Sequence, residues 1–266
     1  MSAAARMSGP LDDAGRGREP REETLRDRYN RYFSCAVADT PELIRTAYQT
    51  RYQVYCLENA YENATDFPDG LETDKYDSHS EHSVLTYRPT ADTIGTVRLI
   101  LPDHDPRLGP AAQRILEYSG STPFPLSTTA EVSRFSLCKR HPRGEGQMRR
   151  TIRDATANDD VFTMHTGPMM SLGLIQGAVR MTMRHRITHW CAIIEPRFLR
   201  MLAAMGIHFI PVGPLVEHHG VRQPCYCHVD SVLRFVRHER PSFWDVLTDG
   251  GALNVPRGSE GQRPAG

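Results

Sequence analysis

Four short groups of charged and aromatic residues follow one another along the sequence and form a candidate chemical site. A carboxylate that heads a strand can take a proton from a substrate, and the planar fork of an arginine can hold a carboxylate. These groups contain three acids, which suit the first role, and three arginines, which suit the second. In chain order the groups are Arg51 with Tyr55, Asp74 with Asp77, Arg98 within Gly95–Leu99, and Glu131 with Ser133 and Arg134 within Glu131–Phe135.

The three cations and three carboxylates allow two interpretations. Paired and partly buried, they would hold the loop that carries Asp74 over a sheet and form one wall of a binding pocket. A purely structural ion network would use the same residue types. The residues alone leave both interpretations open.

The segments around these groups predict the elements that position them. Thr40 can cap a helix that opens at Pro41 and runs to about Leu57. Arg51 falls on the apolar stripe of this helix, so it should point inward and needs a carboxylate partner. The polar loop of residues 58–80 that follows is long enough to favour a functional role.

Strands and helices alternate through the rest of the chain. This pattern predicts a mixed central sheet flanked by helices, an α+β fold of the α/β/α sandwich type. On the strand that begins near Glu131, residues Ser133 and Phe135 should share its face unless a bulge re-aims them. The expected strands are His82–Arg88, Thr93–Leu101, Ala130–Leu137, Trp190–Ile194, Phe209–Val212 and Cys225–Val229, and the expected later helices are Met169–Arg186 and Pro196–Gly206.

The motifs R-x-x-V-Y, D-x-x-D, G-x-x-R-L and E-x-S-R-F, in this order, resemble those of a known family. They are similar to the motifs of the N-acyl-homoserine-lactone (autoinducer) synthases and their wider relatives, the N-acyl amino acid synthases. The strongest resemblance is to the acyltransferases associated with the PEP-CTERM/exosortase system. It spans about residues 40–235, and its specific part ends at Phe135. The resemblance implies a GNAT-like acyltransferase fold.

The same resemblance assigns roles to the residues that match the motifs. It implies that three of them are catalytic and that five form an acceptor-binding and electrostatic network. The catalytic residues would be Glu131, Ser133 and Arg134, and the network would be Arg51, Tyr55, Asp74, Asp77 and Arg98.

Acyl transfer from a thioester to an amine sets clear chemical demands. An α-amino group has a pKa of about 8 and is mostly protonated at neutral pH, so a base must take its proton. Glu131 is the candidate, acting directly or through a water. Backbone N–H groups of a splayed or bulged strand would stabilise the oxyanion, and the resemblance implies Ser133–Phe135. Because a thioester is already activated, no cofactor, metal or covalent intermediate is expected.

Two departures from the lactone synthases bear on the acceptor. The Trp that they place after the aromatic residue has no counterpart before Tyr61, and this chain is longer. Both favour an amino-acid-like acceptor over S-adenosylmethionine. We therefore predict transfer of a fatty acyl group from an acyl-carrier-protein or coenzyme A thioester to the amine of a small acceptor. A lactone synthase that uses S-adenosylmethionine and a non-catalytic carrier-protein-binding module are the alternatives.

Cationic residues gather between residues 139 and 153, where Glu145 is the one opposite charge. Acyl carrier proteins are acidic, so a basic patch beside the acyl site would steer them into place. A solvated loop with a chance excess of arginine is the alternative interpretation. The predicted docking residues are Lys139, Arg140, Arg149 and Arg150.

Metal binding, nucleic-acid binding and membrane insertion are not expected. Cys225, Cys227 and His228 lack a second ligand pair at zinc-finger spacing. Lys plus Arg and Asp plus Glu both number 32, so no global field attracts a phosphate backbone. The apolar runs are far shorter than the roughly 20 residues that span a bilayer.

The two ends of the chain lack hydrophobic periodicity. We predict disordered tails at residues 1–30 and 250–266, around one GNAT-like acyltransferase domain at residues 31–249. The first thirty residues also contain no apolar signal segment, which predicts a cytoplasmic location.

Overall fold

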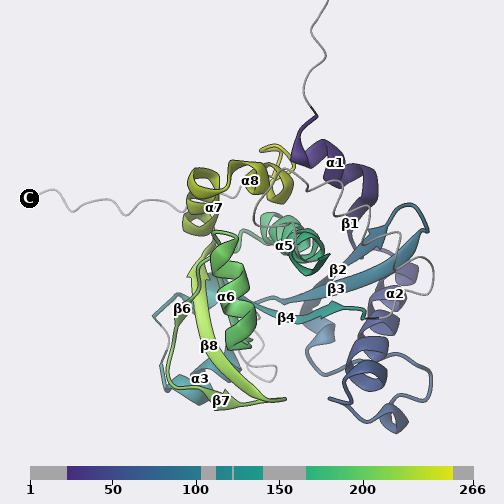
Figure 1. Cartoon of the computed structure of the whole chain (residues 1–266). Helices are drawn as coiled ribbons and strands as arrows, with labels where there is room; N and C mark the ends of the chain where they lie inside the picture. The colour runs from purple at the N-terminus through teal and green to yellow at the C-terminus, as the bar shows by residue number, and fades with distance from the viewer. Residues whose placement is uncertain (1–22, 103–111, 122, 140–165, 254–266) are drawn as a thin grey trace, which may run out of the picture.

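An open mixed sheet of eight strands organises the structure (Figure 1). The computed structural model describes residues 23–102, 112–121, 123–139 and 166–253. The strand order is β1-β2-β3-β4-β5-β8-β6, and β7 pairs with β8 off this path. The strands are β1 (Phe33–Val37), β2 (Ser80–Tyr87), β3 (Asp92–Ile100), β4 (Thr129–Leu137), β5 (His189–Ile194), β6 (Ile210–Pro211), β7 (Val216–Glu217) and β8 (Val221–His228).

Helices cover both faces of this sheet, as Figure 1 shows. The long helix α5 lies over β1–β3 and builds the main hydrophobic core, and α2 covers β2 and β3 on the other face. Near β8, α6 contributes to the main core and α3 to a second apolar cluster. The α-helices are α1 (Leu25–Tyr32), α2 (Pro41–Tyr52), α3 (Gln113–Ser119), α5 (Thr166–His185), α6 (Pro196–Ala204), α7 (Val229–Glu239) and α8 (Pro241–Leu247).

The predicted fold class is therefore confirmed. The hairpin of β2 and β3, the strands β4 and β5 and the helices α5 and α6 lie within a few residues of their predicted bounds. Strand β6 is shorter than predicted and β8 is longer toward its N-terminal end.

Helix α2 begins as its sequence predicts. The Thr40 hydroxyl accepts a hydrogen bond from the Leu43 N–H at 3.3 Å, and Pro41 occupies the first turn. The chain then continues without a break into a π-helix, η1 (Gln53–Glu58). A π-helical turn rotates the following side chains relative to a regular α-helix and is common at functional sites.

The N-terminal boundary differs from the prediction. A tail was expected to reach residue 30, but α1 occupies Leu25–Tyr32. Thr24 and Asp27 form a capping box that starts this helix, and Leu25 and Tyr29 are buried in the main core. Burial of the apolar face of this short helix stabilises it, although the residues around it are polar. At the other end the described chain continues to Leu253, which packs against the core.

Helices α7 and α8 were not predicted from the sequence. Helix α7 buries Val229, Val232, Leu233 and Val236 on one face, an i, i+3, i+4, i+7 pattern. None of the helices in the described residue ranges is both long and apolar enough to cross a membrane.

Candidate active site

Arg51 is fully buried beneath the loop that connects η1 to β2. Its Nε donates to Oε2 of Glu72 at 2.5 Å, and its Nη1 and Nη2 donate to the two oxygens of Asp77 at 2.6 and 3.1 Å. Two carboxylates therefore take three donor positions of the guanidinium. The inward orientation and the carboxylate partner predicted for Arg51 are both confirmed.

Arg98 on β3 is equally buried and lies beside Arg51. Its Nη1 donates to Asp74 at 2.6 Å and to Asp77 at 2.8 Å, while its Nε donates to the hydroxyl of Ser133 at 3.0 Å. Arg98 thus connects the loop to strand β4. Asp77 joins two guanidiniums that approach it from different elements.

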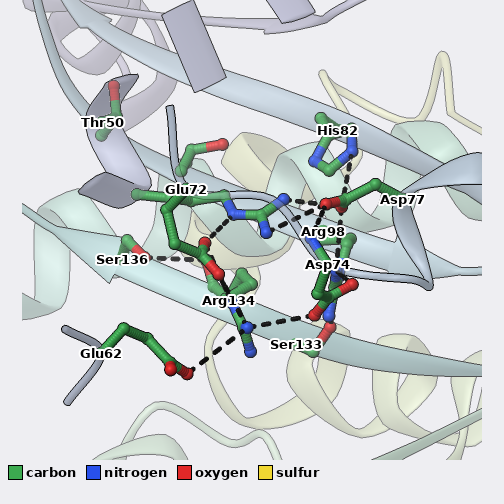
Figure 2. Close-up of polar contacts among 12 residues, drawn as sticks. Thr50, Glu62, Glu72, Asp74, Asp77, His82, Arg98, Ser133, Arg134 and Ser136 are labelled. Atoms are coloured by element: carbon green, nitrogen blue, oxygen red, sulfur yellow. Dashed lines mark hydrogen bonds and ion pairs between the residues drawn. The ribbon is translucent and has the colours of Figure 1, made fainter. Parts of the chain in front are cut away.

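Arg134 on β4 completes the network, as Figure 2 shows. Its Nη2 lies 2.9 Å from Glu72 and 3.0 Å from Asp74, and its guanidinium lies over the ring of Tyr55 at 4.8 Å. Three guanidiniums therefore bind three carboxylates of a single loop. We call this set the ion network: Arg51, Arg98, Arg134, Glu72, Asp74 and Asp77.

The network keeps its carboxylates ionised. Burial alone would raise the pKa of Glu72, but hydrogen bonds from Arg51 and Arg134 bring it below its usual value. The pKa values of Asp74 and Asp77 are lowered against the same effect of burial, mainly by Arg98 and Arg51. His82 lies at 3.5 Å from Asp77, and burial together with Arg51 lowers its pKa to about 3, so its ring is neutral.

The predicted membership of this network is wrong in one respect. Glu131 was expected among the paired acids, but Glu72 takes that position between Arg51 and Arg134. With Glu131 as a partner, three acids match three arginines and no further acid is needed. With Glu131 as the base, one arginine lacks a carboxylate, and Glu72, two residues before Asp74, is the acid that could supply it.

A β-bulge brings Arg134 into the network. Arg98 pairs with Ser133 and Thr96 pairs with Ser136, so the one intervening residue of β3 opposes two residues of β4. Arg134 has a φ of 47°, a left-handed conformation that costs a non-glycine residue about 1 to 2 kcal/mol. Its bonds to the loop carboxylates offset that cost.

The bulge also corrects the predicted faces of β4. Ser133 lies on the network side as expected, but Arg134 follows it there and Phe135 turns to the opposite side. The Phe135 ring packs against Phe198 of α6, with ring centroids 5.0 Å apart.

Strands β4 and β5 separate just beyond Glu131. Their parallel pairing joins Thr129–Glu131 to His189–Cys191 and ends there. A cavity of about 350 Å³ opens between the two strands. Its walls are mostly apolar and include Val132, Phe135 and Leu137 from β4, Trp190, Ala192 and Ile194 from β5, Ile175 and Ala178 from α5, and Phe198 and Leu202 from α6.

A smaller and more polar cavity of about 90 Å³ adjoins the first. The two cavities share Tyr55, Tyr61, Ser133, Arg134 and Arg222 among their walls. The polar cavity adds Glu131, Arg114, His218 and His219. Arg114, His218 and His219 were not selected from the sequence, nor was Arg222.

Glu131 is 4% exposed and lines the polar cavity. Burial raises the pKa of its carboxyl to about 7, although the nearby charges of Arg114, Arg98 and Arg134 oppose this shift. A carboxyl with such a pKa exchanges a proton readily near neutral pH. Its position next to Ser133 on the cavity wall is suited to a general base.

Two aromatic residues, one in η1 and one at the start of the loop, also line both cavities. Tyr55 lies in the π-helix η1, and its ring centroid lies 5.7 Å from that of Tyr61. Tyr61 in turn contacts His219 of the β7–β8 turn, with ring centroids 5.2 Å apart. Aromatic side chains from both sides therefore meet where the two cavities join.

The structure describes one of the four predicted docking residues. Lys139 follows β4, where its backbone N–H donates to Glu58 at 2.8 Å and its side chain binds Asn59. Arg140, Arg149 and Arg150 lie outside the described residues. The docking surface stays a prediction.

Three of the cysteines lie on or next to strands of the sheet, at Cys138, Cys225 and Cys227. Burial raises the pKa of Cys138 to about 12, which keeps its thiol protonated and unreactive. Cys225 and Cys227 are buried on β8. Within the described ranges, no three His, Cys, Asp or Glu side chains are grouped to hold a metal ion.

Comparison with known proteins agrees with this geometry. Residues 50–151 match the family described as the acetyltransferase (GNAT) domain. No curated protein sequence matches the chain. The matched segment carries η1, the loop, the β2–β3 hairpin and β4, so it contains the whole ion network.

Solved structures with a similar fold include several synthases. TofI, in a ternary complex with an inhibitor and MTA, has a TM-score of 0.55 at 15% identity, covering 83% of this chain and 100% of that one. MesI, a CoA-dependent acyl-homoserine lactone synthase, has a TM-score of 0.51 at 17% identity, covering 77% and 93%. FeeM, an N-acyl amino acid synthase from uncultured soil microbes, has a TM-score of 0.46 at 13% identity, covering 76% and 93%.

The protein is an acyltransferase with a GNAT domain over residues 50–151. The domain match gives this class, and the mixed sheet with its separated central strands gives the fold. At such low identities the similarity to TofI and MesI concerns the fold alone.

The ion network predicts a large and specific effect of removing one carboxylate. Glu72 is 1% exposed and binds two buried guanidiniums, so Glu72→Gln should lower the free energy of unfolding by about 3 kcal/mol, the usual cost of breaking a buried pair. Urea denaturation measures this change. Glu117→Gln on the exposed side of α3 is the matched control and should change it by less than about 0.5 kcal/mol. Equal effects of the two substitutions would contradict the assigned role of Glu72.

Proposed function

We propose that the protein is an N-acyltransferase that moves a fatty acyl group from an acyl-carrier-protein thioester to the amine of an amino-acid-like acceptor. The observation that carries this proposal is the joining of two different cavities at one point of β4. The larger cavity is apolar and the smaller one holds a carboxyl of raised pKa. An acyl chain and a polar amine would meet there beside Glu131.

The reaction follows from that arrangement. The carboxylate of Glu131 takes a proton from the acceptor ammonium, and the freed amine attacks the thioester carbonyl carbon. A new C–N bond forms, the C–S bond breaks, and the thiolate leaves with a proton from the nitrogen. Beyond Glu131 the residues of β4 no longer pair with β5, so their backbone can face the oxyanion.

The ion network supports this chemistry from behind the cavity wall. It fixes Arg134 and Ser133 on β4 by bonds to the loop and to Arg98. Preorganised side chains need no rearrangement as charge develops in the reaction, which is the main electrostatic advantage of a rigid site. The aromatic residues Tyr55 and Tyr61 close the junction of the cavities.

Lactone synthesis from S-adenosylmethionine is the second candidate. The fold similarity to MesI, a CoA-dependent acyl-homoserine lactone synthase, favours it. In that case an acyl-coenzyme A thioester, rather than an acyl-carrier-protein thioester, is a possible acyl donor. A carrier-protein-binding module without turnover is a third candidate, and an association with the PEP-CTERM/exosortase system stays a prediction from the motifs.

One assay separates these candidates. The protein is incubated with acyl-carrier-protein or acyl-coenzyme A, a mixture of amino acids and S-adenosylmethionine, and both free thiol and lipid products are measured by mass spectrometry. An N-acyl amino acid supports the proposal. An acyl-homoserine lactone would support the second candidate, and binding of the carrier protein without thiol release would support the third.

Glu131 gives the proposal a pH signature. Only its ionised form accepts a proton, so kcat/KM should rise as pH increases through about 7, the pKa that burial gives this carboxyl. Glu131→Gln should lower kcat by about 10²- to 10⁴-fold and abolish that rise, with the protein still folded. Glu239→Gln at the exposed end of α7 is the control and should keep the wild-type pH profile. A Glu131→Gln variant with an unchanged profile would show that another group is the base.

A further inference from the structure

The polar cavity is lined by an unusual excess of positive charge. Three guanidiniums reach it from three elements: Arg114 from α3, Arg134 from β4 and Arg222 from β8. Glu131 is the one acid among its lining residues. The apolar cavity next to it shares Arg134 and Arg222, adds Glu195 and lacks Arg114.

These three guanidiniums differ in what already binds them. Arg134 is held by Glu72 and Asp74 of the ion network. Arg222 lies 3.5 Å from the exposed carboxylate of Glu195. Among the residues placed by the structure, Arg114 has no carboxylate within ion-pairing distance. An unpaired cation in a cavity wall is a binding position for an anion.

The surroundings of Arg114 hold it in place without neutralising it. Its Nη1 lies 3.3 Å from Nε2 of His218, and its guanidinium lies over the ring of Tyr76 at 5.3 Å. Burial and the charges of Arg114, His219, Arg134 and Arg222 lower the pKa of His218 to about 4. The imidazole is therefore neutral at neutral pH and accepts the hydrogen bond from Arg114. The full positive charge of Arg114 remains available to a ligand.

We propose that Arg114, assisted by Arg222, binds the carboxylate of a small α-amino acid and so directs its amine toward Glu131. This inference rests on the proposed function and adds the acceptor class and the residue that selects it. A free α-amino acid carries a carboxylate and an amine on one carbon. It therefore matches a cavity whose walls present a guanidinium and a proton-accepting carboxyl.

The size and charge of the cavity narrow the acceptor further. The polar cavity has a volume of about 90 Å³, which is small for a ligand site. Glycine, alanine and serine fit such a space, whereas S-adenosylmethionine is several times larger. Its sulfonium would also be repelled by the guanidiniums of Arg114, Arg134 and Arg222.

The test compares L-alanine with L-alaninamide, which keeps the amine and loses the carboxylate. Saturation-transfer NMR reads millimolar binding without turnover, so this comparison needs neither a product nor a variant. We expect the amide to bind the wild-type protein about 10- to 100-fold more weakly, the usual loss when a charge-assisted hydrogen bond is removed. Equal binding of the two compounds would overturn the inference.

Variants assign the effect to Arg114. Arg114→Gln should weaken L-alanine binding by a similar factor and leave L-alaninamide binding unchanged, so that the wild-type preference disappears. Arg234→Gln, on the exposed face of α7, is the matched control and should keep the preference. Circular dichroism and the unfolding midpoint check that both variants fold. A preference that persists in a folded Arg114→Gln protein would also overturn the inference.

The binding test and the turnover assay fail independently. If L-alanine binds through Arg114 but no N-acyl amino acid forms from any donor, the carboxylate site stands and the proposed function fails. N-acyl amino acids could also form while Arg114→Gln binds L-alanine as the wild-type protein does and L-alaninamide binds as well as L-alanine. In that case the proposed function stands and the assignment of Arg114 fails.

Discussion

Three buried guanidiniums constrain the whole active-site half of this protein. Removing an ion of this kind from water costs several kcal/mol, and close, hydrogen-bonded ion pairs offset that cost. Arg51 and Arg98 are fully buried on two different elements, so their carboxylate partners must come to them. Glu72, Asp74 and Asp77 do so from a single loop. The loop is therefore tied across the sheet at three points, and its position is a consequence of charge rather than of apolar packing.

The same constraint shapes strand β4. Arg134 can reach Glu72 and Asp74 only because the bulge turns it to the face that Ser133 already occupies. The left-handed backbone at Arg134 and the end of pairing with β5 after Glu131 lie within four residues. Beyond Glu131 this strand still pairs with β3 but no longer with β5, and the two cavities lie along the unpaired side. The ion network thus connects the loop, the opening in the sheet and the site of chemistry.

Local patterns in the sequence predicted most helices and strands and the inward direction of Arg51. Both depend on the side-chain periodicity of a single segment and on the free-energy cost of burying a charge, which can be judged without the rest of the fold. They did not reveal Glu72, since its role depends on binding both Arg51 and Arg134, which lie on elements far apart in the sequence. The exchange of faces between Arg134 and Phe135 was equally hidden, because a bulge depends on the partner strand. Arg114 could not be singled out either, since its significance comes from the absence of a described carboxylate within ion-pairing distance rather than from any motif.

The ion network holds both the loop and the bulged part of β4. Hydrogen exchange measured by mass spectrometry on the wild-type protein and on a Glu72→Gln variant shows whether it does. We expect at least tenfold faster exchange in the variant over residues 70–80 and 132–137, with exchange in α5 unchanged. Faster exchange spread evenly over the protein, or none in those two segments, would contradict it.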